Sequence, residues 1–160
     1  MPYDREAAVT YAHRWAYDRN PRYLNFAGIG GDCTNFVSQC LNAGGCKMNY
    51  TKNTGWYYTT SDNRAPAWTG VEFLYSFLME NKGVGPYAEV IKIEDLAPGD
   101  VIQLSSNGEI YTHTLLVVEI KEGKTKDDIL VAAHSYDSDN RPLSTYSVEM
   151  IRYLKIYARE

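Results

Sequence analysis

A cysteine and two histidines are the residues of this chain whose types and positions could carry out covalent chemistry. Cys33 directly follows Asp32, which stands like an N-cap in front of an apolar helical pattern. The positive end of a helix stabilises a thiolate, so a thiol placed there is expected to have a lowered pKa. The free backbone N–H groups could also hold a developing oxyanion. Cys33 is therefore a candidate nucleophile, and the plainer alternative is a small core residue.

Two histidines lie in apolar segments of the second half, His113 in THTLLVV and His134 in ILVAAH. The third, His13, falls on the polar face of an early helix and is expected at the surface. A two-residue turn at 123–124 would set His113 opposite His134 in an antiparallel pair. A histidine beside Cys33 could take its proton, and a second polar group could orient the ring. We assign His113 as the base and His134 as the orienting residue.

The third catalytic position and a metal site are the open alternatives at these residues. Asp137, Asp139 and Asn140, in the loop after His134, compete with it for the orienting role. Cys33 and the two histidines could instead bind zinc, but the chain has no Cys-x-x-Cys or His-Glu-x-x-His spacing. We therefore expect no metal and no other cofactor.

The remaining cysteines are not expected to take part in the reaction. The chain has 3 cysteines, so at least one is free in a monomer. Cys40 lies in the apolar stripe of its helix and is expected to be a buried thiol. Cys46 follows two glycines, and its state is undetermined, although a disulfide with Cys40 is conceivable across the helix end.

The elements that must position these residues fall into two halves. Helical periodicity predicts helices over 4–19, 32–43 and 70–81, the last with Thr69 and Glu72 in capping-box spacing. Short apolar runs predict strands over 101–104, 114–120, 129–133 and 150–157. Helices followed by strands indicate one α+β domain over 1–160 with an antiparallel sheet, helical in about 1–83 and strand-forming in about 84–160.

A long polar and aromatic segment, 47–68, separates the last two helices and carries candidate substrate-binding residues. These are Trp56, Tyr57 and Trp68. Loops of this length are usually functional or poorly ordered, and aromatic rings suit glycan or peptide recognition. The second functional hypothesis is therefore a catalytically inactive module that binds cell-wall glycan or peptide through this loop. Ordinary packing of the rings is the plainer alternative.

Composition excludes several classes of protein. The 160 residues carry a net charge of -4, which argues against nucleic acid because Lys and Arg supply most of the affinity for phosphates. No run approaches the roughly 18 apolar residues of a membrane span, and the first residues lack the apolar core of a signal peptide. We expect a soluble monomer without membrane insertion.

The segment GDCTNFVSQCLNAGG, residues 31–45, resembles the bacterial putative amidase domain family. That family is similar to the CHAP and NlpC-type groups of papain-like cysteine peptidases. The segments LAPGDVIQL, THTLLVV and AHSYDSDNRPLS extend the resemblance over most of the chain. It implies a papain-like fold in which N-terminal helices pack on an antiparallel sheet.

The resemblance also implies residue roles. It carries over Cys33 as nucleophile and His113 as base, with His134 as the third residue. Gln39 does not match the papain-type oxyanion glutamine, because it points from the helix interior, which leaves Asp32 and the Cys33 N–H as local candidates. The implied activity is a thiol hydrolase that cleaves an amide bond in a peptide or peptidoglycan-like substrate.

Members of such families are often parts of secreted or surface proteins. An extracellular or cell-surface location, within a longer exported protein, is therefore expected. The acidic charge gives no long-range attraction to anionic wall polymers.

Overall fold

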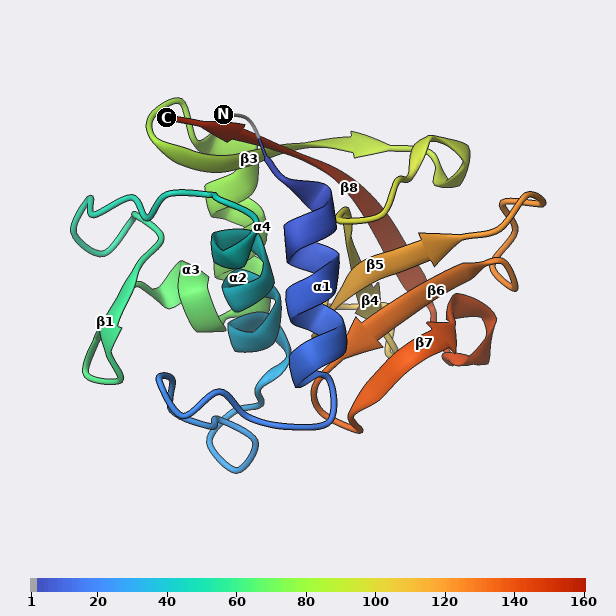
Figure 1. Ribbon diagram of the computed structural model, residues 1–160, viewed down its shortest axis with the longest axis horizontal. Helices are drawn as coiled ribbons and strands as arrows, with labels where there is room; N and C mark the ends of the chain where they lie inside the picture. The colour runs from blue at the N-terminus through green and yellow to red at the C-terminus, as the bar shows by residue number, and fades with distance from the viewer. Residues whose placement is uncertain (1–2) are drawn as a thin grey trace.

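The computed structural model describes residues 3–160 and consists of a helical part and a sheet (Figure 1). The helices are α1 Arg5–Trp15, α2 Cys33–Ala43, α3 Pro66–Thr69 and α4 Val71–Glu80. Strands β1 Tyr58–Thr60 and β2 Asn63–Arg64 form a small hairpin. The main sheet contains β3 Gly85–Ile91, β4 Val101–Ser105, β5 His113–Ile120, β6 Ile129–Ala133, β7 Ser138–Pro142 and β8 Met150–Arg159. Two short 3-10 helices are η1 Ile93–Asp95 and η2 Leu143–Thr145.

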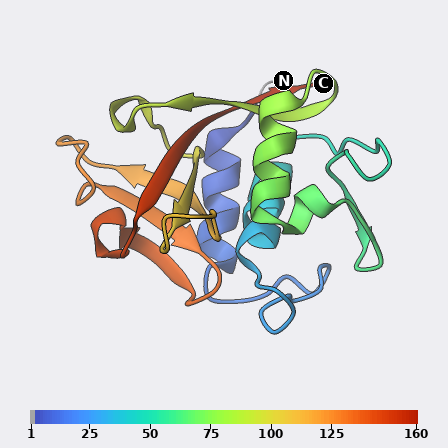
Figure 2. The same ribbon diagram turned by 180° about the vertical axis from the view of Figure 1, so that it is seen from behind.

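The main sheet is antiparallel between every pair of neighbours, in the order β3-β8-β4-β5-β6-β7. The helices lie against one face of the sheet, and α1 and α2 run side by side there (Figures 1 and 2). The predicted α+β class with an antiparallel sheet is confirmed.

Both faces of the central strands are buried, because alternate residues of these strands enter two separate cores. On the helical face, Leu116 of β5 packs in one cluster with Phe36 and Val37 of α2. On the opposite face, Leu115 packs in a second cluster with Leu143. The connections that contain η1 and η2 cover this second face. A one-residue change of register would therefore move a side chain from one core to the other.

Several elements differ from the sequence-based expectation. The predicted helix 70–81 is confirmed as α4, but a further short helix, α3, which was not predicted, ends directly before it at Gly70. The capping box does not form, because Thr69 ends α3 and its hydroxyl accepts a hydrogen bond from Arg64 Nε at 3.1 Å. Strands β3 and β7 were not predicted. They are the edge strands of the sheet, and the polar sequence of β7, SDNRP, lacks apolar alternation.

The two tryptophans of the aromatic segment 47–68 are part of the core rather than of a recognition surface. Trp56 and Trp68 are 0% exposed and Tyr57 is 9% exposed. The indole N–H groups donate to α2, Trp56 to Ser38 Oγ at 3.0 Å and Trp68 to Asn35 Oδ1 at 3.0 Å. Buried indoles usually find such partners. The binding role expected for Trp56 and Trp68 is therefore wrong, because both rings are packed in the core. Tyr57 instead lies beside the exposed Tyr50, with the ring centroids 5.7 Å apart.

The helices of residues 3–160 are at most 11 residues long, and none of them could cross a bilayer.

Candidate active site

Cys33 lies in the first turn of α2, directly over the start of β5. Its Sγ is 4.0 Å from the carbonyl oxygen of Thr112 and 3.7 Å from Thr34 Oγ1. The Thr34 hydroxyl in turn lies 2.9 Å from the hydroxyl of Thr114. These contacts fix the first turn of α2 on the sheet, and they leave 9% of Cys33 exposed.

Beneath this turn, a row of polar side chains crosses three strands. Thr114 of β5 pairs with Gln103 of β4, and Gln103 pairs with Arg152 of β8. Gln103 Nε2 donates to Thr114 Oγ1 at 3.3 Å, and Arg152 Nε donates to Gln103 Oε1 at 2.9 Å. Thr114 and Gln103 are fully buried. The sheet is therefore polar where it meets the thiol, although the next row on the same face toward the start of β4, Val101, Leu116 and Leu154, is apolar.

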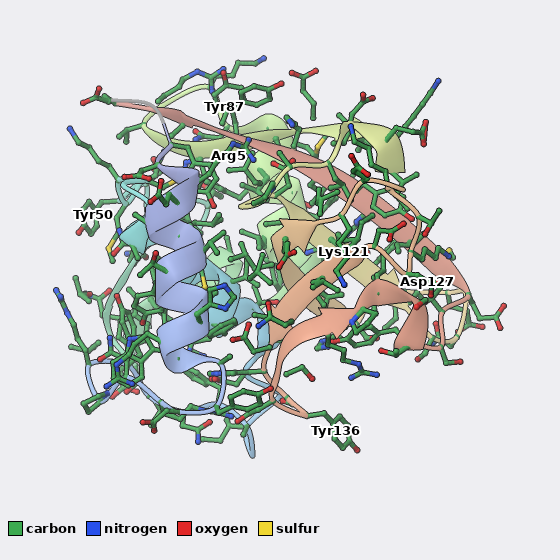
Figure 3. All side chains as sticks on the ribbon, turned by 45° about the vertical axis from the view of Figure 1, so that its right-hand side comes forward. Arg5, Tyr50, Tyr87, Lys121, Asp127 and Tyr136 are labelled. Atoms are coloured by element: carbon green, nitrogen blue, oxygen red, sulfur yellow. The ribbon has the colours of Figure 1, made fainter. Side chains whose placement is uncertain are left out.

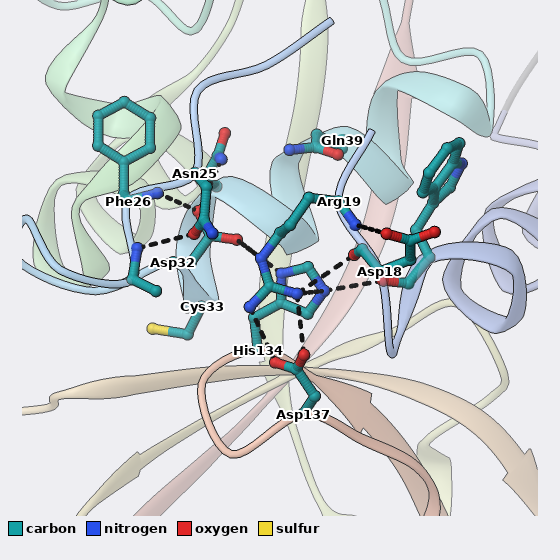
Figure 4. A network of polar contacts seen from close by, with 12 residues as sticks. Asp18, Arg19, Asn25, Phe26, Asp32, Cys33, Gln39, His134 and Asp137 are labelled. Atoms are coloured by element: carbon teal, nitrogen blue, oxygen red, sulfur yellow. Dashed lines mark hydrogen bonds and ion pairs between the residues drawn. The ribbon is translucent and has the colours of Figure 1, made fainter. Parts of the chain in front are cut away.

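Asp32 takes the N-cap position of α2, but within the described residues its side chain forms no cap hydrogen bond. Its Oδ1 accepts from the Phe26 N–H at 2.8 Å and from Asn35 Nδ2 at 2.9 Å. Its Oδ2 accepts from His134 Nδ1 at 2.6 Å (Figure 4). Instead of capping the helix, the Asp32 carboxylate thus forms hydrogen bonds that connect α2 with the preceding loop and with the residue after β6. Burial raises the pKa of this carboxyl group, but the hydrogen bonds from His134, Asn35 and Phe26 outweigh burial and lower it overall.

The imidazole of His134 is held on both of its nitrogens. Nδ1 donates to Asp32, and Nε2 lies 2.8 Å from the Trp15 carbonyl oxygen and 3.2 Å from Arg19 Nη1. The ring also stacks on Phe36, with the ring centroids 4.1 Å apart, and the residue is 1% exposed. His134 is therefore fixed in place beside the residue that precedes Cys33.

Arg19 extends this network to the loop after β6. It donates to Asp137 Oδ2 from Nη1 at 2.9 Å and to Oδ1 from Nη2 at 3.0 Å (Figure 4). The other loop candidates lie elsewhere: Asp139 pairs with the exposed His13 at 2.8 Å, and Asn140 is exposed with a φ of 53°. The surface position expected for His13 is confirmed.

The predicted pairing of His113 with His134 is wrong. β5 and β6 pair Leu116 with Ala132, and the same register continued by two residues would set Thr114 opposite His134. The connection is not a two-residue turn. It spans 121–128, with the Lys121 N–H bonded to the Asp128 carbonyl at 2.9 Å (Lys121 is labelled in Figure 3).

A register that differs by one residue separates the two histidines across the sheet. His113 shares a face with Leu115, and its ring centroid lies 5.9 Å from that of Tyr146. Burial, aided by the charge of Arg141, lowers the pKa of His113 to about 4. Its imidazole is therefore neutral at physiological pH. Among residues 3–160, neither of its nitrogens has a hydrogen-bond partner.

Burial decides the protonation of Cys33. It raises the pKa of the thiol, although hydrogen bonds from Thr114 and Thr34 act in the opposite direction. The lowered pKa expected from the helix terminus is therefore wrong for this structure. Cys33 rests as a thiol and needs a base to become nucleophilic.

Cys40 and Cys46 are free and buried, at 0% and 1% exposure. The core position expected for Cys40 is confirmed, Cys46 is a core thiol too, and the conceivable disulfide is not formed. The alternative zinc shell of Cys33, His113 and His134 is not assembled, because the histidines lie on opposite faces. Within residues 3–160, no three His, Cys, Asp or Glu side chains gather as ligands for a metal ion.

Sequence reasoning missed the polar side chains that surround Cys33. Gln103 and Thr114 had a signal, since each is a polar residue inside an apolar strand whose burial demands a partner. No sequence signal identified Arg19 and Arg152, because a single arginine is expected at the surface until its tertiary partners are known.

Comparisons with known proteins agree with the resemblance carried by the Cys33 segment. The model of the putative amidase domain family matches residues 2–157. The uncharacterized protein YhbB of Bacillus subtilis is 38% identical over 142 residues, which cover 87% of this chain and 43% of that protein. The chain thus spans less than half the length of this relative. No solved structure matches significantly. A family match over nearly the whole chain assigns it: the chain belongs to the putative amidase domain family.

Proposed function

We propose that this domain hydrolyses an amide bond with Cys33 as the nucleophile. The observation that carries the proposal is the position of Cys33 in the first turn of α2, over a polar part of the sheet, in a chain of the putative amidase domain family. Cys33 is also the most exposed of the three cysteines, with 9% against 0% for Cys40 and 1% for Cys46.

The unused cap of α2 supports this role. Because the Asp32 side chain bonds elsewhere, it does not cap the N–H groups of the first turn. Such groups can stabilise the oxyanion of a tetrahedral intermediate. The Cys33 N–H is therefore proposed as one oxyanion donor, and Asp32 serves by leaving it free.

The proposed base is His113. Its imidazole is neutral and has no partner within residues 3–160, whereas both nitrogens of His134 are already engaged. His113 directly follows Thr112, whose carbonyl contacts the thiol. In the resting structure the His113 ring lies on the face of the sheet opposite to Thr114 and Cys33, so the proposal requires the backbone at this strand end to turn when substrate binds. Catalytic hydrogen bonds often form only in the substrate complex.

The chemical steps then balance as follows. His113 accepts the thiol proton, and the sulfur attacks the substrate carbonyl carbon. The tetrahedral intermediate collapses, and the leaving amine takes the proton from His113. Water, deprotonated by the same imidazole, attacks the thioester and releases the acid and the free thiol. His134, tied to Asp32, positions the first turn.

The substrate proposed is a peptide or peptidoglycan-like peptide, and the location proposed is the cell surface or the exterior, within a longer exported protein. Incubation with purified muropeptides, followed by mass spectrometry, tests both the activity and the substrate class. The wild type should release a fragment with a new carboxylate and a new amine. Cys33→Ala should lose about four orders of magnitude or more in rate.

Matched histidine variants separate the two roles. His113→Gln should lose about 100-fold or more in turnover with little change in thermal unfolding, because it removes the base. His134→Gln should lower the unfolding midpoint. Full turnover in His113→Gln, together with loss in a folded His134→Gln, would overturn the assignment of the base.

A further inference from the structure

The guanidinium group of Arg152 is held flat between two aromatic rings at the polar row beneath α2. Its Cζ lies 3.4 Å from the ring centroid of Tyr75 and 3.7 Å from that of Tyr111. Stacking on two rings restrains the plane of the guanidinium and leaves its edges available for hydrogen bonds. Such a restrained fork suits a planar acceptor such as a carboxylate.

At one edge of this guanidinium both donors bond to the protein, and at another edge only one of the two donors does. Gln103 Oε1 accepts from Nε at 2.9 Å and from Nη2 at 2.6 Å. At the outer edge, Nη2 also donates to Glu72 Oε1. Nη1, the second donor of this edge, has no partner within residues 3–160. A carboxylate bound across Nη1 and Nη2 would complete the edge.

The present partner of this edge can be displaced. The Glu72 side chain is 54% exposed, whereas that of Arg152 is 13% exposed. An ion pair with so exposed a partner contributes little to stability, because water competes for the carboxylate. The Arg152 guanidinium is thus held in place, whereas the Glu72 carboxylate that neutralises it lies on the solvent side.

Two chains of contacts connect Arg152 with the thiol. Tyr111, which stacks on Arg152, is two residues before His113, and the carbonyl of the intervening Thr112 contacts Cys33 Sγ. Arg152 is also two strands from Thr114 in the same cross-strand row, which places their backbones roughly 10 Å apart. The Arg152 side chain leans toward β4, where it bonds to Gln103, and this shortens the span to roughly the length of one or two substrate residues.

We propose that Arg152 is a specificity residue that binds a carboxylate of the substrate within roughly one or two residues of the scissile amide. The carboxylate displaces Glu72 and bonds to Nη1 and Nη2, while Gln103 holds the opposite edge. The domain therefore selects anionic amides. This inference rests on the proposed function of Cys33. The net charge of -4 does not attract anions, so the attraction must come from Arg152 itself.

Two matched alkylating reagents, the α-carboxamides of iodoacetyl-glutamate and iodoacetyl-glutamine, test this directly, because only the first carries a carboxylate. In both, the Cys33 sulfur displaces iodide from the methylene carbon, and the reagents differ only in a carboxylate or amide on the side chain. We expect the wild type to react about threefold or more faster with the glutamate reagent. Glu72→Gln, which frees the outer edge, should increase this ratio further. Arg152→Gln should bring it to the value of free cysteine.

Peptide mapping restricts the rates to Cys33, because it separates the Cys33 product from any product at Cys40 or Cys46, which are less exposed. A ratio equal to that of free cysteine in both the wild type and Glu72→Gln would overturn the proposal, and neither protein depends on the folding of the Arg152 variant. The proposed hydrolysis is tested separately, because alkylation needs only an accessible thiol. A carboxylate preference without amide turnover would reject the function and keep the anion site.

Discussion

The Cys33 thiol lies at the positive end of α2, yet protein encloses nearly all of it. The helix terminus favours the thiolate, whereas burial favours the neutral thiol, and burial prevails because it raises the pKa of Cys33. His113 has the complementary property, with a pKa lowered to about 4. In the resting protein both groups are therefore neutral.

This resting state predicts the pH dependence of Cys33 alkylation. A raised pKa means that the thiolate fraction still increases above pH 9, so the rate with iodoacetamide should continue to rise from pH 7 to pH 10. Stopped assays at a series of pH values, with free cysteine as the reference, measure this. A rate that reaches its plateau below pH 8 would show a lowered pKa and contradict the effect of burial.

The sequence predicted some residues of the site better than others. Cys33 was identifiable because its position at a helix start follows from local signals, Asp32 and the apolar stripe. The cross-strand partner of each histidine was not identifiable, because the register depends on the length of the 121–128 connection, which residue propensities do not determine. Arg152 became visible only through contacts with residues far away in the sequence.

At the scale of elements, α2 is anchored by Asp32 rather than capped by it. The carboxylate joins the loop at Phe26, the helix at Asn35 and the sheet at His134. A buried carboxylate with three hydrogen bonds is costly to disrupt, since its partners are left unpaired. The orientation of the first turn, and so of Cys33, depends on this residue.

Asp32→Asn should accordingly lower the free energy of unfolding by about 3 kcal/mol at pH 7, because one partner of a buried pair is removed. The pKa of Asp32 is lowered in the fold, so its contribution is present above the unfolded pKa and is lost as the pH falls through the folded pKa. Urea unfolding at pH 7 and at pH 3 measures the difference.

A matched control is Asp4→Asn, since Asp4 caps α1 through the Ala7 N–H at 3.0 Å and asparagine also caps well. This control should change stability by less than about 0.5 kcal/mol. An Asp32→Asn protein as stable as this control at pH 7 would contradict the anchoring role.

Element prediction succeeded where hydrophobic periodicity was strong and failed at the edges of the sheet. The strand 129–133 was predicted with the bounds that the structure has, because its residues are continuously apolar. β3 and β7 are edge strands with mixed polarity, and their pairing is set by the sheet that they join.

At the scale of the whole molecule, the segment 47–68 completes the core over α2 and α4. Trp56 and Trp68 have ring centroids 4.6 Å apart, and each donates its indole N–H to α2. An excess of aromatic residues in a long segment was compatible with either a binding surface or a core. Only the tertiary fold decides between them.

Trp68→Ala should therefore destabilise the domain by about 3–5 kcal/mol, as expected for a fully buried aromatic side chain. Tyr136→Ala, which removes a ring that is 92% exposed and projects into solvent (Figure 3), should change stability by less than about 0.5 kcal/mol. Thermal or urea unfolding compares the two. A small effect of Trp68→Ala would restore the aromatic segment as a candidate recognition surface.

The central claim is that the Cys33 sulfur forms the covalent bond to the substrate acyl group. Intact-mass spectrometry of the protein during turnover, with peptide mapping, tests it most directly. We predict the added mass of one acyl group on Cys33 in the wild type and none in a folded Cys33→Ala protein. Acylation of another residue, or undiminished amide hydrolysis by Cys33→Ala, would contradict the claim.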